Sequence, residues 1–362
     1  MATLLFALAA AALNLAPAQL YVAPEGNDNN AGTRQAPFKS IARAGGLARP
    51  GSTIHVAPGR YAGGFRTSQS GAPGARIAFV STVQWGAQIV PPPVSRTDTA
   101  WDNRGSHVDI IGFQIDGRLP QNGVKWTHGI YNGGSYGLIQ HNWVHHLATD
   151  VPCTSAGGSA IGVDSYYRGV DAKVVANLVH DIGPAGCPYV QGIYVSTSGT
   201  VTNNIVYRVA AAGIHLWHDA TRVTINNNTV TGSHTGIIVG AGNYYFRSGP
   251  NDHTVVANNI VFDNQTGIAE LGDTGKENRY INNLVYRNEL DDYRLQNGLL
   301  PTGSVSADPG FVRYSRTGSP DLRLRAGSPA IGKAAPMHAP ALDFAGQGRR
   351  AAAAKDIGAF QH

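Results

Sequence analysis

A short pattern repeats along the middle of the chain and restricts the folds that the chain can adopt. A Gly-Ile pair opens an apolar alternation at Gly192-Ile193 and again at Gly213-Ile214. Each unit then reaches paired asparagines, at Asn203-Asn204 and at Asn227-Asn228, and closes with a short apolar run. The last Asn of each unit falls at six places: Asn142, Asn177, Asn204, Asn228, Asn259 and Asn283.

The spacing of these six asparagines defines the repeating unit. Successive positions differ by 35, 27, 24, 31 and 24 residues, which fits a basic coil of 24 residues with insertions. Units of this size with three short strands and no helical periodicity predict an all-β parallel β-helix, in which each coil covers the apolar face of its neighbour. Asn suits a corner of such a coil, because it tolerates the left-handed backbone region and stacked amides can bond between coils.

Composition agrees with a strand-rich solenoid. A chain of 362 residues with 45 Gly and only 14% charged residues is turn-rich rather than helical, and its length allows one elongated body. The formal charge of +5 favours an acidic partner by long-range attraction. Nucleic acid is not expected, since the only basic cluster is Arg349-Arg350.

The first residues favour export. An apolar run from Leu4 to Leu15 precedes the small residues Ala16-Pro17-Ala18, which predicts a signal peptide over residues 1–18 and a secreted or periplasmic protein. The n-region has no Lys or Arg, and the alternative is an apolar first strand. The run is too short to cross a membrane, and no other segment is apolar enough to do so.

The two cysteines, Cys153 and Cys187, are expected to form one disulfide in an exported protein. Each lies in the loop before the first strand of consecutive coils, so that stacking of the coils can bring the loops together. Two unpaired, partly buried thiols are the alternative.

The expected order of elements begins with a helix over Phe38–Leu47 and a strand over Thr53–Val56. Strands over Arg76–Val80 and Val108–Ile115 then form early, less regular coils, and regular coils follow from about residue 128 to 287. We expect three regions in a monomer: the signal peptide over 1–18, the β-helix with its N-terminal cap over 19–306, and a C-terminal cap over 307–362.

Segments near both ends carry a resemblance to a known family. The first are YVAPEGNDNNAGT, APFKSI and PGSTIHVAPGRY, and the last are ADPGFVRY, SPDLRLRAGSPAIG, LDFAGQGRR and KDIGAFQH. They resemble the entry and closing segments of secreted right-handed parallel β-helix proteins of the pectate lyase type, among them several polysaccharide lyases. The resemblance implies a right-handed β-helix whose N-terminal helix covers the open end of the solenoid.

In the lyases that this chain resembles, the Gly-Ile strand is the first of three and substrate lies along its outer face. Period-two alternation then sets the direction of each side chain. The inward column is Ile130, Ile161, Ile193, Ile214, Ile237 and Ile268. The outward columns are Tyr131, Gly162, Tyr194, His215, Ile238 and Ala269, and beside them Asp164, Ser196 and Trp217.

Neighbouring coils lie about 4.8 Å apart, so that Tyr194 and His215 are expected to stand side by side. We expect His215 to be the base and Tyr194 the acid, or the reverse, with Arg208 or Arg168 pairing with a substrate carboxylate. Surface ladders of the same residue types without catalytic roles are the alternative. The expected substrate-binding residues are Trp217, His218, Arg168, Asp164, His180, Tyr189 and Gln191.

These residues favour a secreted lyase that cleaves an acidic, uronic acid-containing polysaccharide by β-elimination. A C5-epimerase, a glycoside hydrolase and a non-catalytic carbohydrate-binding β-helix are the alternatives. No cofactor is expected as a necessity. Calcium is possible through the scattered Asp164, Asp181 and Asp219, and no spacing typical of a zinc site is present.

Overall fold

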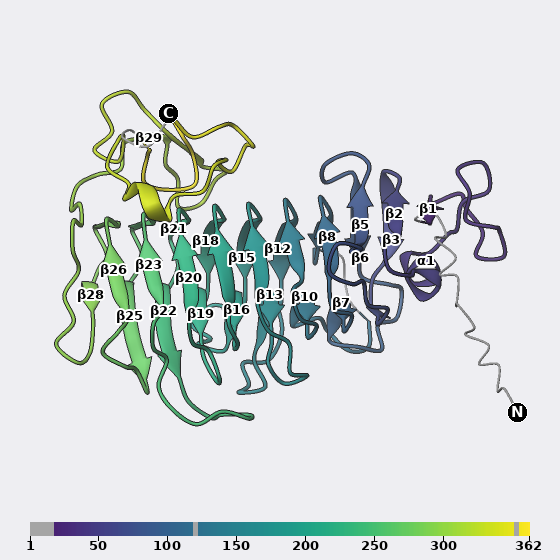
Figure 1. Ribbon diagram of the computed structural model, residues 1–362, viewed down its shortest axis with the longest axis horizontal. Helices are drawn as coiled ribbons and strands as arrows, with labels where there is room; N and C mark the ends of the chain where they lie inside the picture. The colour runs from purple at the N-terminus through teal and green to yellow at the C-terminus, as the bar shows by residue number, and fades with distance from the viewer. Residues whose placement is uncertain (1–17, 119–121, 351–354) are drawn as a thin grey trace, which may run out of the picture.

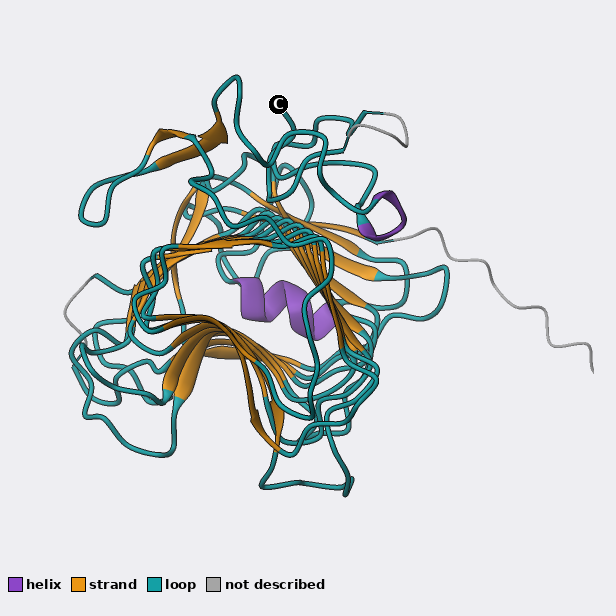
Figure 2. Ribbon diagram, turned by 90° about the vertical axis from the view of Figure 1, so that its left-hand side faces the viewer, coloured by secondary structure: helices purple, strands orange, loops and turns teal. Residues whose placement is uncertain are grey.

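The computed structural model describes residues 18–118, 122–350 and 355–362, which wind into a stack of three-sided coils (Figure 1). Each coil gives one strand to each of three parallel sheets, and the end-on view shows these sheets enclosing one interior (Figure 2). The predicted parallel β-helix is therefore confirmed. The expected signal peptide over residues 1–18 lies outside the described residues except for Ala18.

The three sheets are named here by what their strands carry. The Gly-Ile sheet holds β4 Phe65–Thr67, β7 Thr99–Asn103, β10 His128–Asn132, β13 Gly158–Val163, β16 Val190–Val195, β19 Ala212–Leu216, β22 Thr235–Ala241, β25 Thr266–Gly272 and β28 Asp291–Arg294. The Asn sheet, whose strands lead to the repeated asparagines, holds β1 Gln19–Val22, β2 Thr53–Val56, β5 Ile77–Ser81, β8 Val108–Ile111, β11 Leu138–Gln140, β14 Ala172–Val175, β17 Gly199–Thr202, β20 Val223–Asn226, β23 Val255–Ala257 and β26 Arg279–Ile281. The third sheet holds β3 Gly59–Ala62, β6 Ala87–Val90, β9 Gln114–Asp116, β12 Trp143–Leu147, β15 Leu178–Ile182, β18 Ile205–Val209, β21 Thr229–Thr231, β24 Ile260–Phe262 and β27 Leu284–Tyr286.

Three local expectations need correction. The helix α1 spans Ile41–Leu47 rather than beginning at Phe38, because Ser40 caps it by accepting the amide of Arg43. The strand expected over Val108–Ile115 is two strands, since Gly112 adopts a positive φ of 79° and turns the chain from the Asn sheet to the third sheet. Regular three-strand coils also begin earlier than residue 128, with β2, β3 and β4.

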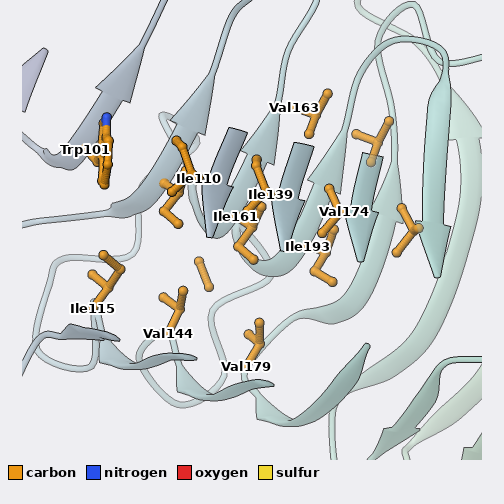
Figure 3. Packing of buried hydrophobic residues seen from close by; sticks show 14 of the residues in the cluster. Trp101, Ile110, Ile115, Ile139, Val144, Ile161, Val163, Val174, Val179 and Ile193 are labelled. Carbon is orange, nitrogen blue, oxygen red and sulfur yellow. The ribbon is translucent and has the colours of Figure 1, made fainter. Parts of the chain in front are cut away.

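The core is a set of apolar columns that run through the stack. The inward column of the Gly-Ile sheet is confirmed, since Ile130 pairs with Ile161, and Ile161 in turn with Ile193. Figure 3 shows Ile161 and Ile193 facing Ile139 and Val174 of the Asn sheet. Each side chain of these columns is almost completely buried, so that burial on the inner faces fixes the register of the strands.

A ladder of buried amides follows the Asn sheet. The six repeated asparagines are fully buried, and the side-chain Nδ2 of one bonds to Oδ1 of the next. Asn228, for example, accepts both the backbone amide and the Nδ2 of Asn204, at 2.8 and 2.9 Å, and donates to Oδ1 of Asn259 at 2.9 Å. The ladder therefore satisfies polar groups that the corner would otherwise leave unpaired in the interior.

The left-handed corner residue is the one before each ladder asparagine. These residues have φ between 48° and 59°, and they are His141, Ala176, Asn203, Asn227, Asn258 and Asn282. Asparagine therefore serves two purposes in the paired positions, since the first tolerates the left-handed backbone and the second builds the ladder.

The described residues 307–350 and 355–362 of the C-terminal segment lie along the outside of the coils (Figure 1). Its strands β29 Phe311–Arg313 and β30 Asp321–Leu324 pair antiparallel, and it ends beyond the 3-10 turn Pro336–His338. The corner asparagines hold it, because Asn282, Asn258 and Asn203 donate from Nδ2 to the carbonyls of Lys333, Ala335 and Leu342. Its apolar side chains cover the third sheet around Phe262 and Tyr207.

Within the described residues, no helix is both long and apolar enough to cross a membrane.

We predict that Asn228→Ala lowers the free energy of unfolding by about 2–4 kcal/mol, because it leaves buried amide and carbonyl groups of neighbouring coils without partners. Urea unfolding followed by circular dichroism measures the change. Asn29→Ala, at an exposed position near the N-terminus, is the control and should shift stability by less than about 0.5 kcal/mol. Equal midpoints for the two variants would contradict the structural role of the ladder.

Candidate active site

The outward columns of the Gly-Ile sheet end in a pocket of about 480 Å³. The register is the predicted one: Tyr131 pairs with Gly162, Gly162 with Tyr194, and Tyr194 with His215. Gly162 leaves a gap in this column between two tyrosines, and the gap forms part of the pocket. The volume lies in the range of about 300–1,000 Å³ that is typical of small-molecule sites.

His215 and Tyr194 stand side by side on this column. Their rings meet edge to face, with centroids 5.4 Å apart and planes at 89°. Both ring nitrogens of His215 are buried without a hydrogen-bond partner. Burial, with a smaller effect of the nearby His218, lowers the pKa of His215 to about 3. Burial also raises the pKa of Tyr194, with smaller contributions from Tyr245 and Asp164.

These opposite shifts assign complementary states to the two side chains at neutral pH. His215 is an uncharged imidazole with a free lone pair, whereas Tyr194 keeps its proton. A base and a proton donor therefore lie next to each other on the pocket lining.

Trp217 forms one side of the pocket, and its ring packs against the backbone of three glycines. A Cβ atom added at Gly240, Gly242 or Gly272 would come within 2.9, 2.9 or 2.6 Å of the indole ring. The three glycines of β22 and its surroundings therefore allow the ring to lie close to the sheet. A ring fixed in this way offers its other face to an apolar ligand surface.

Several other predicted residues line the pocket but have structural partners. Gln191 donates to the carbonyl of Pro188 and accepts the amide of Ala212, at 2.9 Å each. Asp164 accepts the hydroxyl of Ser196 at 2.7 Å. The exposed Tyr189 lies on the rim.

The loop after β22 forms another wall, held by His218 and Asp219. The Nδ1 of His218 bonds to the carbonyl of Asn243, and its Nε2 therefore accepts the hydroxyl of Tyr245, both at 2.8 Å. The buried Asp219 accepts the amides of Tyr245 and Phe246 at 3.0 and 3.2 Å. Both side chains thus position the loop.

The predicted disulfide is present and holds a third wall. Cys153 and Cys187 are bonded across a sequence separation of 34 residues. The bond joins the loop that carries residues 155–159 to the one that carries Pro188 and Tyr189, and all of these line the pocket.

Three predicted residues lie elsewhere. Arg208, expected to pair with a substrate carboxylate, belongs to β18 of the third sheet and binds both oxygens of Asp181, at 2.6 and 2.8 Å. It is only seven positions before His215 in sequence, but the corner between β18 and β19 puts the two on different faces. His180 accompanies Asp181 on that face, with Nδ1 2.6 Å from the carboxylate. Arg168 lies in a neighbouring pocket and stacks on Phe246.

His128, Tyr131 and Tyr245 line the pocket and were not among the predicted site residues. Tyr131 was already in the outward column, and His128 lies three positions before it in the same strand. No sequence pattern predicted that Tyr245 lines the pocket, because the irregular loop after β22 has no strand periodicity.

The described residues do not fit a calcium ion in this pocket. Calcium takes six to eight oxygen ligands, whereas the pocket contains one carboxylate, Asp164, which already accepts two hydrogen bonds. Asp219 accepts backbone amides and the hydroxyl of Ser165, and Asp181 is paired with Arg208 on another face.

One other group has a spacing that could hold a metal, namely His146, His180 and Asp181. Trp143 donates its indole N–H to Nε2 of His180 at 2.8 Å, which leaves the ring proton on Nδ1, facing Asp181. With that proton in place Nδ1 has no lone pair for a metal. These contacts describe a hydrogen-bonded ion-pair network around Arg208.

Two family comparisons match parts of the chain. Residues 122–298 match a family described as "Periplasmic copper-binding protein (NosD)", and residues 24–66 match a family described as "Protein of unknown function (DUF1565)". A curated relative, "Uncharacterized protein YwoF" of Bacillus subtilis (strain 168), is 38% identical over 60 residues, which cover 17% of this chain and only 13% of that protein.

Comparison with solved structures agrees with the fold. Pectate lyase Pel9A aligns over 96% of this chain and 97% of its own, with a TM-score of 0.65 and 15% identity. The A-module of the mannuronan C-5 epimerase AlgE6 of Azotobacter vinelandii aligns over 73% of this chain and 67% of its own, with a TM-score of 0.51 and 16% identity. The chain therefore has the pectate lyase-like parallel β-helix fold, as the sequence resemblance implied, and parallel β-helix proteins with this fold include polysaccharide lyases and epimerases.

Replacing both cysteines (Cys153→Ser with Cys187→Ser) should lower the free energy of unfolding by about 2–4 kcal/mol, because the unfolded chain regains the freedom of a long loop. Thermal unfolding of the variant and of the wild type measures the loss. Reductant should lower the midpoint of the wild type and leave that of the variant unchanged. A wild-type midpoint that does not respond to reductant would contradict this prediction.

The lowered pKa of His215 predicts how stability depends on pH. Between about pH 6.5 and 3 the unfolded chain binds a proton that folded His215 does not, so stability falls as pH falls through this range. His215→Gln should reduce the slope of unfolding free energy against pH by up to about 1.4 kcal/mol per pH unit, which corresponds to one bound proton. Urea unfolding at a series of pH values tests this, with the exposed His234 as His234→Gln control. Equal slopes for His215→Gln and the wild type would refute the buried, neutral state.

Proposed function

We propose that this protein is an exported enzyme that cleaves an acidic polysaccharide by β-elimination in the pocket on the Gly-Ile sheet. The observation that carries the proposal is the pair of His215 and Tyr194, in which an imidazole whose two buried nitrogens have no hydrogen-bond partner lies against a protonated phenol. The formation of a disulfide supports export, and the positive net charge supports an acidic substrate.

The proposed reaction uses each side chain once. His215 takes the proton from C5 of a uronic acid, the electron pair forms the C4–C5 double bond, and the C4–O bond breaks. Tyr194 gives its proton to the departing glycosidic oxygen. Rotation of the imidazole about its Cβ–Cγ bond would bring one nitrogen from below the pocket surface to the sugar. The raised pKa of Tyr194 favours the acid role for the phenol over the reverse assignment.

Other side chains would bind the sugars. The outer face of Trp217 is available to stack on a sugar ring. Tyr131 and His128 also line the pocket, and we assign their O–H and N–H groups as the donors to the carboxylate of the reacting sugar. Among the described residues that line the pocket there is no Arg or Lys, so hydrogen bonding would have to stabilise the enolate-like transition state.

The alternatives differ in what the pocket must contain. A glycoside hydrolase of the usual kind needs two carboxyl groups, and Asp164 is the one carboxylate among the described lining residues. An epimerase would use the same proton abstraction but would return a proton to C5 instead of breaking the chain. A non-catalytic binding protein would use Trp217 and the tyrosines without His215.

The experiment follows ultraviolet absorbance of the unsaturated product with alginate, pectate, glucuronan and glycosaminoglycans as substrates. We expect one acidic polymer to give a rise in absorbance, which His215→Gln and Tyr194→Phe each reduce by about 10²–10⁴-fold. Chelator should not affect the rate, since the pocket does not fit calcium. His234→Gln changes an exposed histidine next to the same sheet and should keep full activity.

Each alternative gives a different result in the same assay. New reducing ends without absorbance would favour a hydrolase, and changed sugar configuration without cleavage would favour an epimerase. Retention of polymer without any turnover would favour a binding protein. Full activity in His215→Gln would place the chemistry elsewhere.

A further inference from the structure

A second pocket, lined by three arginines, lies next to the proposed active site. It has a volume of about 480 Å³, and its charged lining residues are Arg168, Arg222, Arg247, Asp171 and Asp219. We call it the arginine pocket. The active-site pocket has no Arg or Lys among its described lining residues, so the two neighbouring pockets differ in kind.

The three arginines form no ion pair among the described residues, whereas arginines such as Arg208 and Arg316 each pair with an aspartate. Arg247 donates from Nη2 to the carbonyl of Pro250 at 3.1 Å, whereas its Nη1 is buried without a hydrogen-bond partner. The guanidinium of Arg168 stacks on the ring of Phe246, with Cζ 4.0 Å from the ring centroid. A buried N–H without a partner is costly unless a ligand accepts it.

The two carboxylates in the lining leave the arginines available. Asp219 accepts the backbone amides of the loop and the hydroxyl of Ser165. Asp171 accepts the hydroxyl of Ser198 at 2.6 Å. Three guanidinium groups against two hydrogen-bonded carboxylates give the pocket a positive balance, and Arg is the side chain best suited to bind a carboxylate in two places.

Adjacent residues connect the two pockets. Asp164 lines the active-site pocket and Ser165 the arginine pocket; His218 and Asp219 divide in the same way. In the loop after β22, Tyr245 lines the first and Phe246 the second. Consecutive residues therefore face different pockets on three separate segments, so the two pockets are direct neighbours.

We propose that the arginine pocket is a binding subsite for the carboxylate of a further uronic acid in the same glycan chain. The proposal rests on the proposed function and adds to it. The arginine pocket then recognises the charge of a sugar other than the one that reacts. Substrates must therefore carry a second acidic sugar and be long enough to place it in the arginine pocket.

Isothermal titration calorimetry with the full chain carrying Tyr194→Phe, which under the proposed reaction slows cleavage of the probes, tests the subsite, and the arginine substitutions are titrated in this background. The probes are disaccharides and hexasaccharides prepared from pectate and from alginate, together with methyl esters of the same hexasaccharides. The variants are Arg222→Ala, whose exposed side chain has no hydrogen-bond partner in the described structure, and the double variant Arg168→Ala with Arg247→Ala. Arg294→Ala is the matched control, because it removes the same charge from an exposed position at the far end of the Gly-Ile sheet.

We expect an acidic hexasaccharide to bind about tenfold more weakly to the double variant, and Arg222→Ala to weaken it in the same direction. The arginine variants should bind the disaccharide and the methyl ester without such a loss. Arg294→Ala should bind the acidic hexasaccharide as tightly as the protein with all its arginines. Equal hexasaccharide affinity with and without the arginine substitutions would overturn the proposal, as would an equal loss for acid and ester. The single variant Arg222→Ala keeps the test decisive if the double variant does not fold.

Failure of the subsite and failure of the proposed reaction are distinguishable. If no absorbance appears with any polymer but the arginine variants lose hexasaccharide binding, the subsite stands and β-elimination fails. If elimination occurs and the KM for hexasaccharides is unchanged in the arginine variants, elimination stands and the subsite is overturned.

Discussion

The buried ladder of asparagine amides is the interaction on which the rest of this structure depends. Each ladder amide satisfies backbone groups of neighbouring coils inside a corner that water does not reach, which a purely apolar corner could not do. The ladder holds the coils at a constant register. That register decides which outward side chains become neighbours, so the meeting of Tyr194 and His215 follows from hydrogen bonds on another side of the coil.

Much of the fold could be predicted because its rules are local and repeated. Period-two alternation and the Gly-Ile pairs gave the inward isoleucines and the outward column that contains Tyr194 and His215. Prediction failed where corners and loops decide the outcome. Arg208 is close to His215 in sequence but faces another direction, and Tyr245 reaches the pocket on an irregular loop that Asp219 holds by its backbone amides. Neither the direction of Arg208 nor the position of Tyr245 can be predicted from a periodic pattern in the sequence.

Burial shapes the chemistry of the candidate site more than charge does. Desolvation keeps the imidazole of His215 neutral and the phenol of Tyr194 protonated, and no fixed cation within the described pocket lining assists them. The positive charges lie in the neighbouring arginine pocket, which is lined by residues next in sequence to those of the active-site pocket. Under the proposed function, recognition in the arginine pocket would be separate from reaction at His215 and Tyr194, so proton transfer to and from a sugar would not compete with strong ion pairs.

The contacts of the C-terminal segment have a consequence for how the chain acquires its structure. A solenoid can assemble coil by coil, since each coil contacts only its neighbours. Here Asn203 and Asn227 also bond to Leu342 and Asp356, across sequence separations of 139 and 129 residues. The outer corners of these coils therefore close only after Leu342 and Asp356 have been synthesised. A chain that stops before residue 307 would leave the third sheet uncovered around Phe262 and Tyr207.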